Sequence, residues 1–120
     1  MNMEKIGAKA VLIFSIPCPY LKRNVSLRRD SWNYKIVPAH PEVTNRLDLI
    51  KEILSKDDPK ISIYRKKGNP KKIAVFKECP HLLPYNKSIK IALYLLSENE
   101  AVITTCHGVN NIPLDMEEIR

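Results

Sequence analysis

Residues 88–106 read SIKIALYLLSENEAVITTC, and this stretch decides the fold that the sequence predicts. Its first half alternates apolar and polar positions with a period of two, which is typical of a strand with one buried face. Glu98 and Asn99 favour a turn, and a second apolar run follows from Ala101 to Cys106. The stretch therefore predicts two strands joined by a short turn.

Two more strands are predicted just upstream, joined by a basic turn. Residues 60–66 alternate in the same way, and the sequence KGNP at residues 67–70 turns the chain into a further strand at residues 72–78. Residues 79–87 contain two prolines and predict a loop. Together with the two strands above, we expect a run of four short-linked strands.

Residues 42–55 carry the clearest helical pattern in the chain, because apolar residues recur there at helical spacing. These residues are Val43, Leu47, Ile50 and Leu54. Earlier in the chain, residues 8–16 predict a strand, and residues 26–37 predict a short irregular helix that ends at Pro38. We therefore expect an α+β fold, in which an N-terminal strand and helices precede a four-stranded antiparallel sheet packed on the main helix.

The length and the cysteine content bound the class of protein. A chain of 120 residues suits a single domain with an ordinary core, and no apolar run is long enough to cross a bilayer. The three cysteines, Cys18, Cys79 and Cys106, form no C-x-x-C motif, and an odd count is typical of reduced thiols. We expect a cytoplasmic protein that does not bind a membrane.

His40 lies directly before the predicted helix and is the first candidate for a functional residue. Pro41 suits the first helical position, and Glu42 places a carboxylate near the positive end of the helix dipole. The dipole, together with Lys35 and Arg46, opposes a positive charge on His40. We expect a neutral imidazole that can act as a base, and the alternative is that His40 only caps the helix.

The charge of the chain is +7, and its distribution is uneven. Residues 60–77 contain seven Lys and Arg residues and no acid, whereas acids gather near the C-terminus. A dense patch of one sign attracts polyanions, so RNA or DNA is the expected partner. The alternative is a solvated lysine-rich hairpin without a partner.

A second group of candidate site residues consists of two cysteines and two histidines. Cys79 and His81, with Cys106 and His107, would suffice for a zinc ion if their strand ends met, but their spacing fits no common zinc motif. Cys106 next to His107 is also a weak nucleophile candidate, because neighbours on a strand point to opposite faces. We therefore expect neither a metal nor another cofactor.

Several short motifs are in the order found in one nuclease superfamily. They are His40-Pro41-Glu42, Leu49-Ile50, Ile53-Leu54, Asp58-Pro59-Lys60-Ile61, the strands at residues 72–76 and 89–95, and Val102-Ile103-Thr104-Thr105. In this order the chain resembles phage-associated nuclease-like domains of the barnase, endoribonuclease U, colicin and RelE-type superfamily. The resemblance implies an RNase-like core at residues 31–107, cleavage of RNA without metal, and a toxin role with a cognate antitoxin or immunity protein.

Cleavage of RNA without metal needs a base for the 2′-hydroxyl, a cation for the phosphorane, and an acid or hydrogen-bond donor for the leaving oxygen. We assign His40 as the base, Arg65 or Lys66 as the phosphate clamp, Thr104 or Thr105 as a donor, and His107 as the acid. The expected RNA-binding residues are Lys35, Lys67, Lys71 and Lys72, with Trp32 and Tyr64 for base stacking. The alternative function is a non-catalytic nucleic-acid-binding or inhibitor-like accessory protein of a phage or mobile element.

Overall fold

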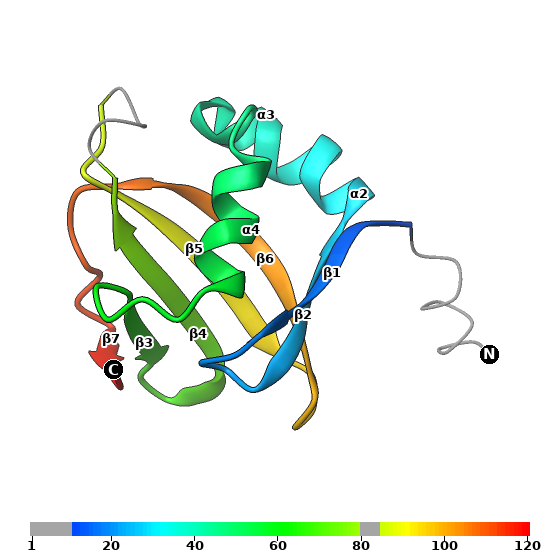
Figure 1. Cartoon of the computed structure of the whole chain (residues 1–120). Helices are drawn as coiled ribbons and strands as arrows, with labels where there is room; N and C mark the ends of the chain where they lie inside the picture. Colours follow the sequence, from blue (N-terminus) through cyan, green and yellow to red (C-terminus); the bar gives the residue numbers. More distant parts are fainter. Residues whose placement is uncertain (1–10, 80–84) are drawn as a thin grey trace.

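The computed structural model describes residues 11–79 and 85–120, which form one sheet with helical segments at one end and across one face (Figure 1). The strands are β1 (Leu12–Cys18), β2 (Arg23–Arg28), β3 (Ser62–Lys66), β4 (Asn69–Glu78), β5 (Ser88–Leu95), β6 (Glu100–Val109) and β7 (Met116–Glu118). The helical segments are α2 (Arg29–Ser31), the π-helical turn η1 (Trp32–Ile36), α3 (Val37–Ala39), the 3₁₀ turn η2 (Pro41–Val43) and α4 (Leu47–Ser55).

The seven strands lie in the order β1-β2-β6-β5-β4-β3-β7, and every neighbouring pair is antiparallel except β2 and β6. The four strands predicted from residues 60–106 are present as β3 to β6 and form the expected meander. Ile89, Ile91 and Leu93 of β5 alternate with half-buried residues and lie in the hydrophobic core. The period-two pattern was therefore sufficient to place β5, whereas β4 has four consecutive buried residues, Ile73 to Phe76.

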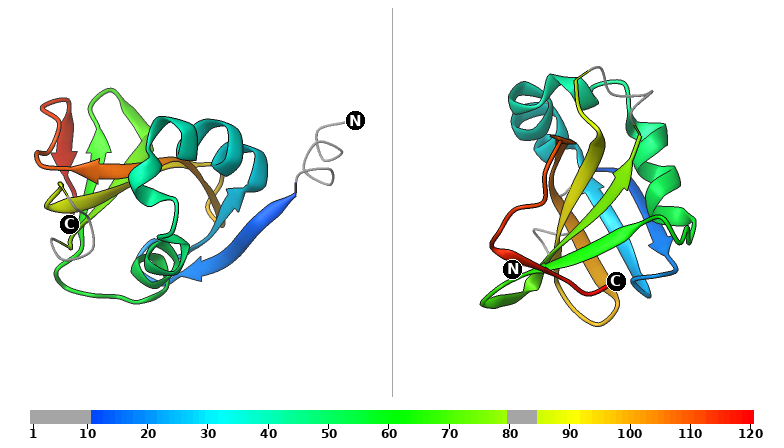
Figure 2. Two further views of the ribbon diagram at one scale, coloured as in Figure 1. Left: turned by 90° about the horizontal axis from the view of Figure 1, so that it is seen from above. Right: turned by 90° about the vertical axis from the view of Figure 1, so that its left-hand side faces the viewer.

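Helix α4 covers one face of the sheet, and we call the opposite face the outer face. Ile50, Ile53 and Leu54 of α4 are at most 1% exposed and pack in the same core as the inward residues of β5. Two perpendicular views place the chain between β6 and β7 on the opposite side of the sheet from α4 (Figure 2). Residues such as Lys90, which alternate with the inward isoleucines, therefore face outward.

The predicted helix at residues 42–55 is shorter than expected. Its first turn is separate, because the chain makes the 3₁₀ turn η2, continues through a turn at Thr44 and Asn45, and begins α4 only at Leu47. The Thr44 hydroxyl donates a hydrogen bond to the carbonyl oxygen of Pro41 at 2.7 Å. Such local side-chain bonds compete with helix formation, which is why Thr and Asn favour turns.

The predicted fold class is wrong, because the sheet has seven strands and not four, and because it is mixed. The irregular helix expected at residues 26–37 begins only at Arg29, since Val25 and Leu27 are fully buried in strand β2. Strand β2 pairs in parallel with β6 over residues 24–26 and brings β1 with it. Strand β2 has only two apolar residues, and basic residues at both of its ends obscured them in the sequence.

The C-terminal segment adds a further strand that the sequence did not suggest. Strand β7 pairs antiparallel with β3 at the far edge of the sheet, with Glu117 opposite Arg65 and Glu118 opposite Tyr64. Met116 is half-buried, and Glu117 and Glu118 are charged and exposed, so the strand lacks the apolar alternation of a half-buried strand. Within the described residues, no helix has the length and apolar character needed to span a membrane.

Candidate functional site

The site is built on the half of β6 that has no neighbouring strand on one side. Strand β2 pairs with β6 only as far as Val102, and beyond that point η1 and η2 contact β6 instead. There the backbone N–H of Gly108 donates a hydrogen bond to Oε2 of Glu42 at 2.9 Å. A Cβ on Gly108 would clash with the side chain of Asn86, so the close approach of chain segments requires glycine here.

Two histidines stack beside this hydrogen bond. The ring centroids of His40, which follows α3, and His107 of β6 are 4.4 Å apart, and the ring planes differ by 19°. Nδ1 of His107 lies 3.1 Å from the carbonyl oxygen of Gly108. Because a carbonyl oxygen can only accept, Nδ1 carries the proton and Nε2 of the neutral ring keeps a free lone pair.

Burial lowers the pKa of His107 below its usual 6.5, and the nearby charges of His40 and Lys90 act in the same direction. The hydrogen bond to Gly108 and the carboxylate of Glu42 oppose this shift but do not cancel it. His107 is therefore neutral near pH 7 and is suited to accept a proton.

Lys90 of β5 stands beside the histidine pair. It is paired in register with His107 on one side and with Phe76 of β4 on the other, and residues paired in this way project from the same face. Burial is the main cause of a lowered pKa at Lys90, while Asp115 acts in the opposite direction. A half-buried cation thus neighbours a neutral imidazole on the outer face.

A cavity of ≈480 Å³ continues from Lys90 along the outer face. We call it the lysine groove, because four lysines line it: Lys35, Lys66, Lys72 and Lys90. Thr104, Thr105 and Tyr94 complete the wall near β6, and Asp115 and Met116 border the opposite side. The groove therefore joins residues from η1, β3, β4, β5 and β6, which are far apart in the sequence.

The lysine groove contains five of the residues predicted from the sequence, namely Lys35, Lys66, Lys72, Thr104 and Thr105. Thr104 is the extra residue of a bulge in β6, and its hydroxyl donates to the carbonyl oxygen of Ala92 at 3.3 Å. The hydroxyl of Thr104 is therefore engaged by the backbone, whereas no hydrogen bond within the described residues engages that of Thr105. Thr105 is the better donor candidate of the two.

Other predicted residues lie elsewhere. Trp32 is only 6% exposed and belongs to the core, so the prediction that it stacks on a base is wrong. Arg65 does not line the groove and forms an ion pair with Glu117 of β7 at 3.3 Å. Tyr64 packs edge-on against Phe76 beside a second cavity, and both Lys67 in the β3–β4 turn and Lys71 near the start of β4 are exposed.

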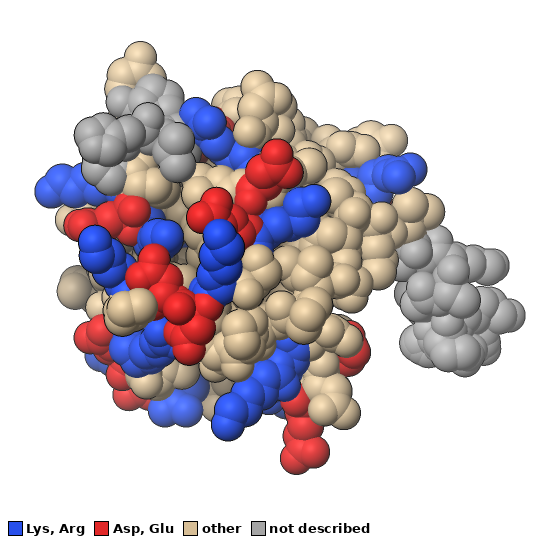
Figure 3. All heavy atoms as spheres, viewed as in Figure 1, with Lys and Arg blue, Asp and Glu red and all other residues tan. Residues whose placement is uncertain are grey.

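The basic hairpin is less positive in the folded protein than in the sequence. Three of its seven cations form ion pairs: Arg65 with Glu117, Lys66 with Asp115, and Lys77 with Asp58 at 3.0 Å. The hydrogen bond from Lys66 also lowers the pKa of Asp115. On the face that carries α4, acidic side chains are interspersed among the basic ones (Figure 3). The acid-free run in the sequence therefore overestimates the positive field of the hairpin.

The prediction that His40 caps the main helix is also wrong. His40 lies between α3 and η2, forms no capping hydrogen bond with its side chain, and precedes α4 by seven residues. The dipole of α4 therefore does not act on its imidazole, because that effect fades within one turn. The stacking on His107, and not a helix terminus, defines the environment of His40.

His40, Glu42 and His107 are also the described residues that come closest to a metal site. One ligand atom from each lies within 4.8 Å of the others, and Nδ1 of His40 is 3.9 Å from Oε2 of Glu42. Of the thiol and imidazole set predicted from the sequence, His81 lies outside the described residues, and Cys106 is buried in the core, away from the outward His107. Burial also raises the pKa of the Cys106 thiol well above its usual range, which removes it as a nucleophile at neutral pH.

The sequence did not identify Glu42 and Lys90 as site residues. Glu42 was assigned to the helix dipole, and Lys90 looked like an ordinary exposed residue of an alternating strand. The outward position of Lys90 could be predicted from that alternation, but its pairing with His107 depends on the strand register. That register includes the bulge at Thr104, which nothing in the sequence indicates.

Comparisons with models of known families, with curated proteins and with solved structures find no match to this chain. The class of protein is therefore defined by its own fold and site: a small mixed-sheet protein with a stacked histidine pair beside a lysine groove. The resemblance to the barnase and RelE-type superfamily stays a prediction from short sequence motifs.

Proposed function

We propose that this protein binds single-stranded RNA in the lysine groove and cleaves it at the His40–His107 pair without a metal ion. The observation that carries the proposal is the position of two stacked imidazoles beside the half-buried Lys90. A neutral imidazole, a second imidazole and a cation are the groups that metal-free cleavage of RNA requires. The groove supports the choice of a polyanionic substrate.

The reaction uses the 2′-hydroxyl of the substrate as the nucleophile. His107 takes the hydroxyl proton at Nε2, the 2′-oxygen forms a bond to phosphorus, and the bond from phosphorus to the 5′-oxygen breaks. His40 in its protonated form gives a proton to the leaving 5′-oxygen, and Lys90 stabilises the phosphorane charge. The products are a 2′,3′-cyclic phosphate and a free 5′-hydroxyl.

This proposal exchanges the roles that were expected from the sequence. His40 was the expected base and His107 the expected acid, but the hydrogen bond to Gly108 and the lowered pKa favour His107 as the base. Lys90 replaces Arg65 and Lys66 as the phosphate cation, because both of those residues are held by carboxylates of the C-terminal segment.

A cytoplasmic location suits this function, because cellular RNA is the available substrate there. All three cysteines are buried free thiols, as expected in a reducing compartment. A cell that makes an RNase able to cleave its own RNA must also restrain it, so we include a cognate antitoxin or immunity protein in the proposal.

The test is cleavage of a synthetic RNA in the presence of EDTA, with the products analysed for a cyclic phosphate end. His40→Ala and His107→Ala should each lower the rate by roughly 100- to 10,000-fold. His81→Gln is the matched control, since the chain has three histidines and His81 has no part in the proposal. A substrate with a 2′-deoxy nucleotide at the cut site should resist cleavage. Full activity of His107→Ala, or dependence on added metal, would contradict the proposal.

One observation favours a second candidate, a non-catalytic RNA-binding protein. The stacked rings and the hydrogen bond between Glu42 and Gly108 join η2 to β6 and would stabilise the fold without any chemistry. Under this alternative the wild-type protein binds RNA but leaves it intact, and His40→Ala lowers the free energy of unfolding. Cleavage by the wild type decides between the two candidates.

A further inference from the structure

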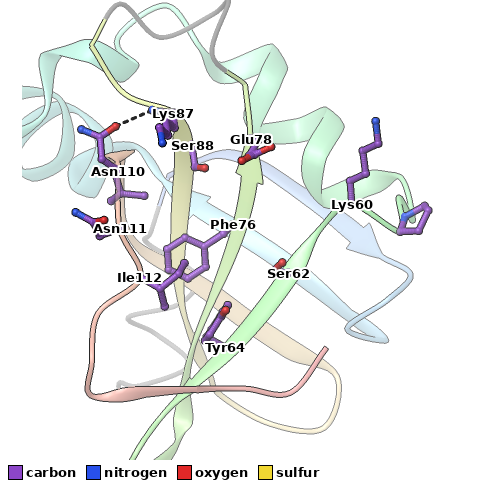
Figure 4. A pocket seen from close by; sticks show the side chains of 12 residues that line it. Lys60, Ser62, Tyr64, Phe76, Glu78, Lys87, Ser88, Asn110, Asn111 and Ile112 are labelled. Carbon is purple, nitrogen blue, oxygen red and sulfur yellow. Dashed lines mark hydrogen bonds between the residues drawn. The ribbon is translucent and has the colours of Figure 1, made fainter.

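A second cavity of ≈740 Å³ lies on the outer face, over the ends of β3, β4 and β5 (Figure 4). The sticks in Figure 4 show Phe76 and Tyr64 on neighbouring strands, and Ile112 lines the same cavity. Polar side chains surround this apolar part of the cavity, among them Lys60, Ser62 and Asn111. The cavity thus combines an aromatic wall with hydrogen-bonding groups at its rim.

The buried ring of Phe76 supports the half-buried ring of Tyr64, so Tyr64 is the ring of this cavity that a ligand can reach. Phe76 is 3% exposed, and Tyr64 meets it edge-on with ring centroids 5.3 Å apart and an angle of 82° between the ring planes. At the rim, the side-chain oxygen of Asn110 accepts a hydrogen bond from the backbone N–H of Lys87 at 2.9 Å. A wall that is fixed before binding loses little conformational entropy when a planar ligand stacks on it.

Two polar groups of the rim are available to a ligand. No hydrogen bond among the described residues engages the hydroxyl of Ser62 or the side-chain amide of Asn111. An amide offers both a donor and an acceptor, and a hydroxyl can serve as either. These are the groups that recognise the edge of a nucleobase, while aromatic side chains stack on its face.

The strand register connects this cavity to the histidine pair. Ser62 pairs with Phe76, Phe76 with Lys90, and Lys90 with His107, so these four residues form one row across the outer face. Neighbouring strands are about 4.8 Å apart, which places Phe76 about 10 Å from His107 with Lys90 between them. In this row an aromatic wall, a cation and an imidazole follow one another.

A nucleotide with a 3′-phosphate has the same order of chemical groups, namely a planar base, a ribose and an anionic phosphate. We propose that the cavity at Phe76 and Tyr64 binds the base of the nucleotide whose 3′-phosphate lies at Lys90. This inference rests on the proposed function and names the part of the substrate that the site recognises. The protein then selects its cleavage position by the base held in this cavity.

The experiment measures binding of nucleoside 3′-monophosphates by titration calorimetry, with inorganic phosphate as the second probe. Neither probe can be cleaved, so binding is independent of catalysis. Tyr64→Leu keeps an apolar side chain but removes the aromatic ring, and it should weaken nucleotide binding by roughly 5- to 150-fold. The same variant should leave phosphate binding unchanged, whereas Lys90→Gln should weaken the binding of both probes.

Asn111→Ala is the second variant, because Asn111 is exposed and its loss cannot prevent folding. It should reduce the preference among the four 3′-nucleotides. Tyr34→Leu is the matched control, since this tyrosine is 83% exposed on η1 and does not line the cavity. Its nucleotide affinity should equal that of the wild type.

Two results would overturn the inference. The first is a wild type that binds 3′-nucleotides no better than phosphate, and the second is nucleotide binding that neither Tyr64→Leu nor Asn111→Ala alters. Failure of the proposed function is a separate result, in which nucleotides bind as expected but RNA stays intact. In that case the cavity remains a nucleotide site of a non-catalytic RNA-binding protein.

Discussion

The number of lysines that face the groove predicts how RNA binding depends on salt. Lys66 is held by Asp115, whereas Lys35, Lys72 and Lys90 form no ion pair among the described residues. For single strands the slope of log K against log salt is about −0.7 for each phosphate contact, so three lysines give a slope of about −2.1. Affinity should then fall roughly 20-fold between about 50 and 200 mM salt.

If all seven cations of residues 60–77 contacted RNA, as the sequence suggests, the slope would be about −4.9 and the loss roughly 1,000-fold. The assay is fluorescence anisotropy with a labelled 2′-O-methyl RNA, which cannot be cleaved. Lys72→Gln should change the slope to about −1.4, and Lys51→Gln on α4, on the opposite face, should leave it unchanged. A slope near −5, or one that Lys72→Gln does not alter, would refute the assignment of the lysine groove.

Three further predictions concern stability and metal ions. Burial lowers the pKa of His107 in the folded protein, so below pH 6.5 the unfolded chain binds more protons than the folded chain does. The free energy of unfolding should therefore fall as the pH drops below that value. Urea denaturation between about pH 5 and 8 should show this slope in the wild type and not in His107→Gln. Ile50→Ala should cost on the order of 2–5 kcal/mol in thermal unfolding, because Ile50 is fully buried, whereas Leu114→Ala, at 94% exposure, should stay within about 0.5 kcal/mol. Zinc added without EDTA should inhibit cleavage by binding the lone pairs of His40 and His107, and Glu42→Gln should weaken this inhibition in a zinc titration.

The alternation that predicted the strands of the meander is clearest where a strand has one buried face. In β5, for example, Ile89, Ile91 and Leu93 are at most 1% exposed, and this burial produces the alternation in the sequence. Strand β7 gives no such signal, since its pairing with β3 rests on backbone hydrogen bonds and ion pairs between exposed residues. Strand β2 is short, so two buried residues were too few to distinguish it from a helical segment.

The candidate site could be predicted only in part, and the reason is again the register of the sheet. His40 and His107 were both candidates, but their stacking requires η2 to lie along the free edge of β6. That contact depends on β2 ending its pairing at Val102, a length that no local pattern encodes. Lys35 and Lys72 were assigned to RNA binding by their charge alone, and their meeting in one groove depends on the folded sheet.

Under the proposed function, the C-terminal strand limits which cations of the hairpin can contact RNA. Strand β7 and the residue before it place Asp115 and Glu117 against Lys66 and Arg65, so the acids of the tail neutralise the hairpin edge. A phosphate near this edge lies close to carboxylates as well as cations, so it gains little binding free energy there. Lys35, Lys72 and Lys90 form no ion pair among the described residues. Of these three lysines, Lys90 lies opposite His107 in the strand register. Under the proposed function, an anion bound in the lysine groove therefore meets Lys90 beside the histidine pair.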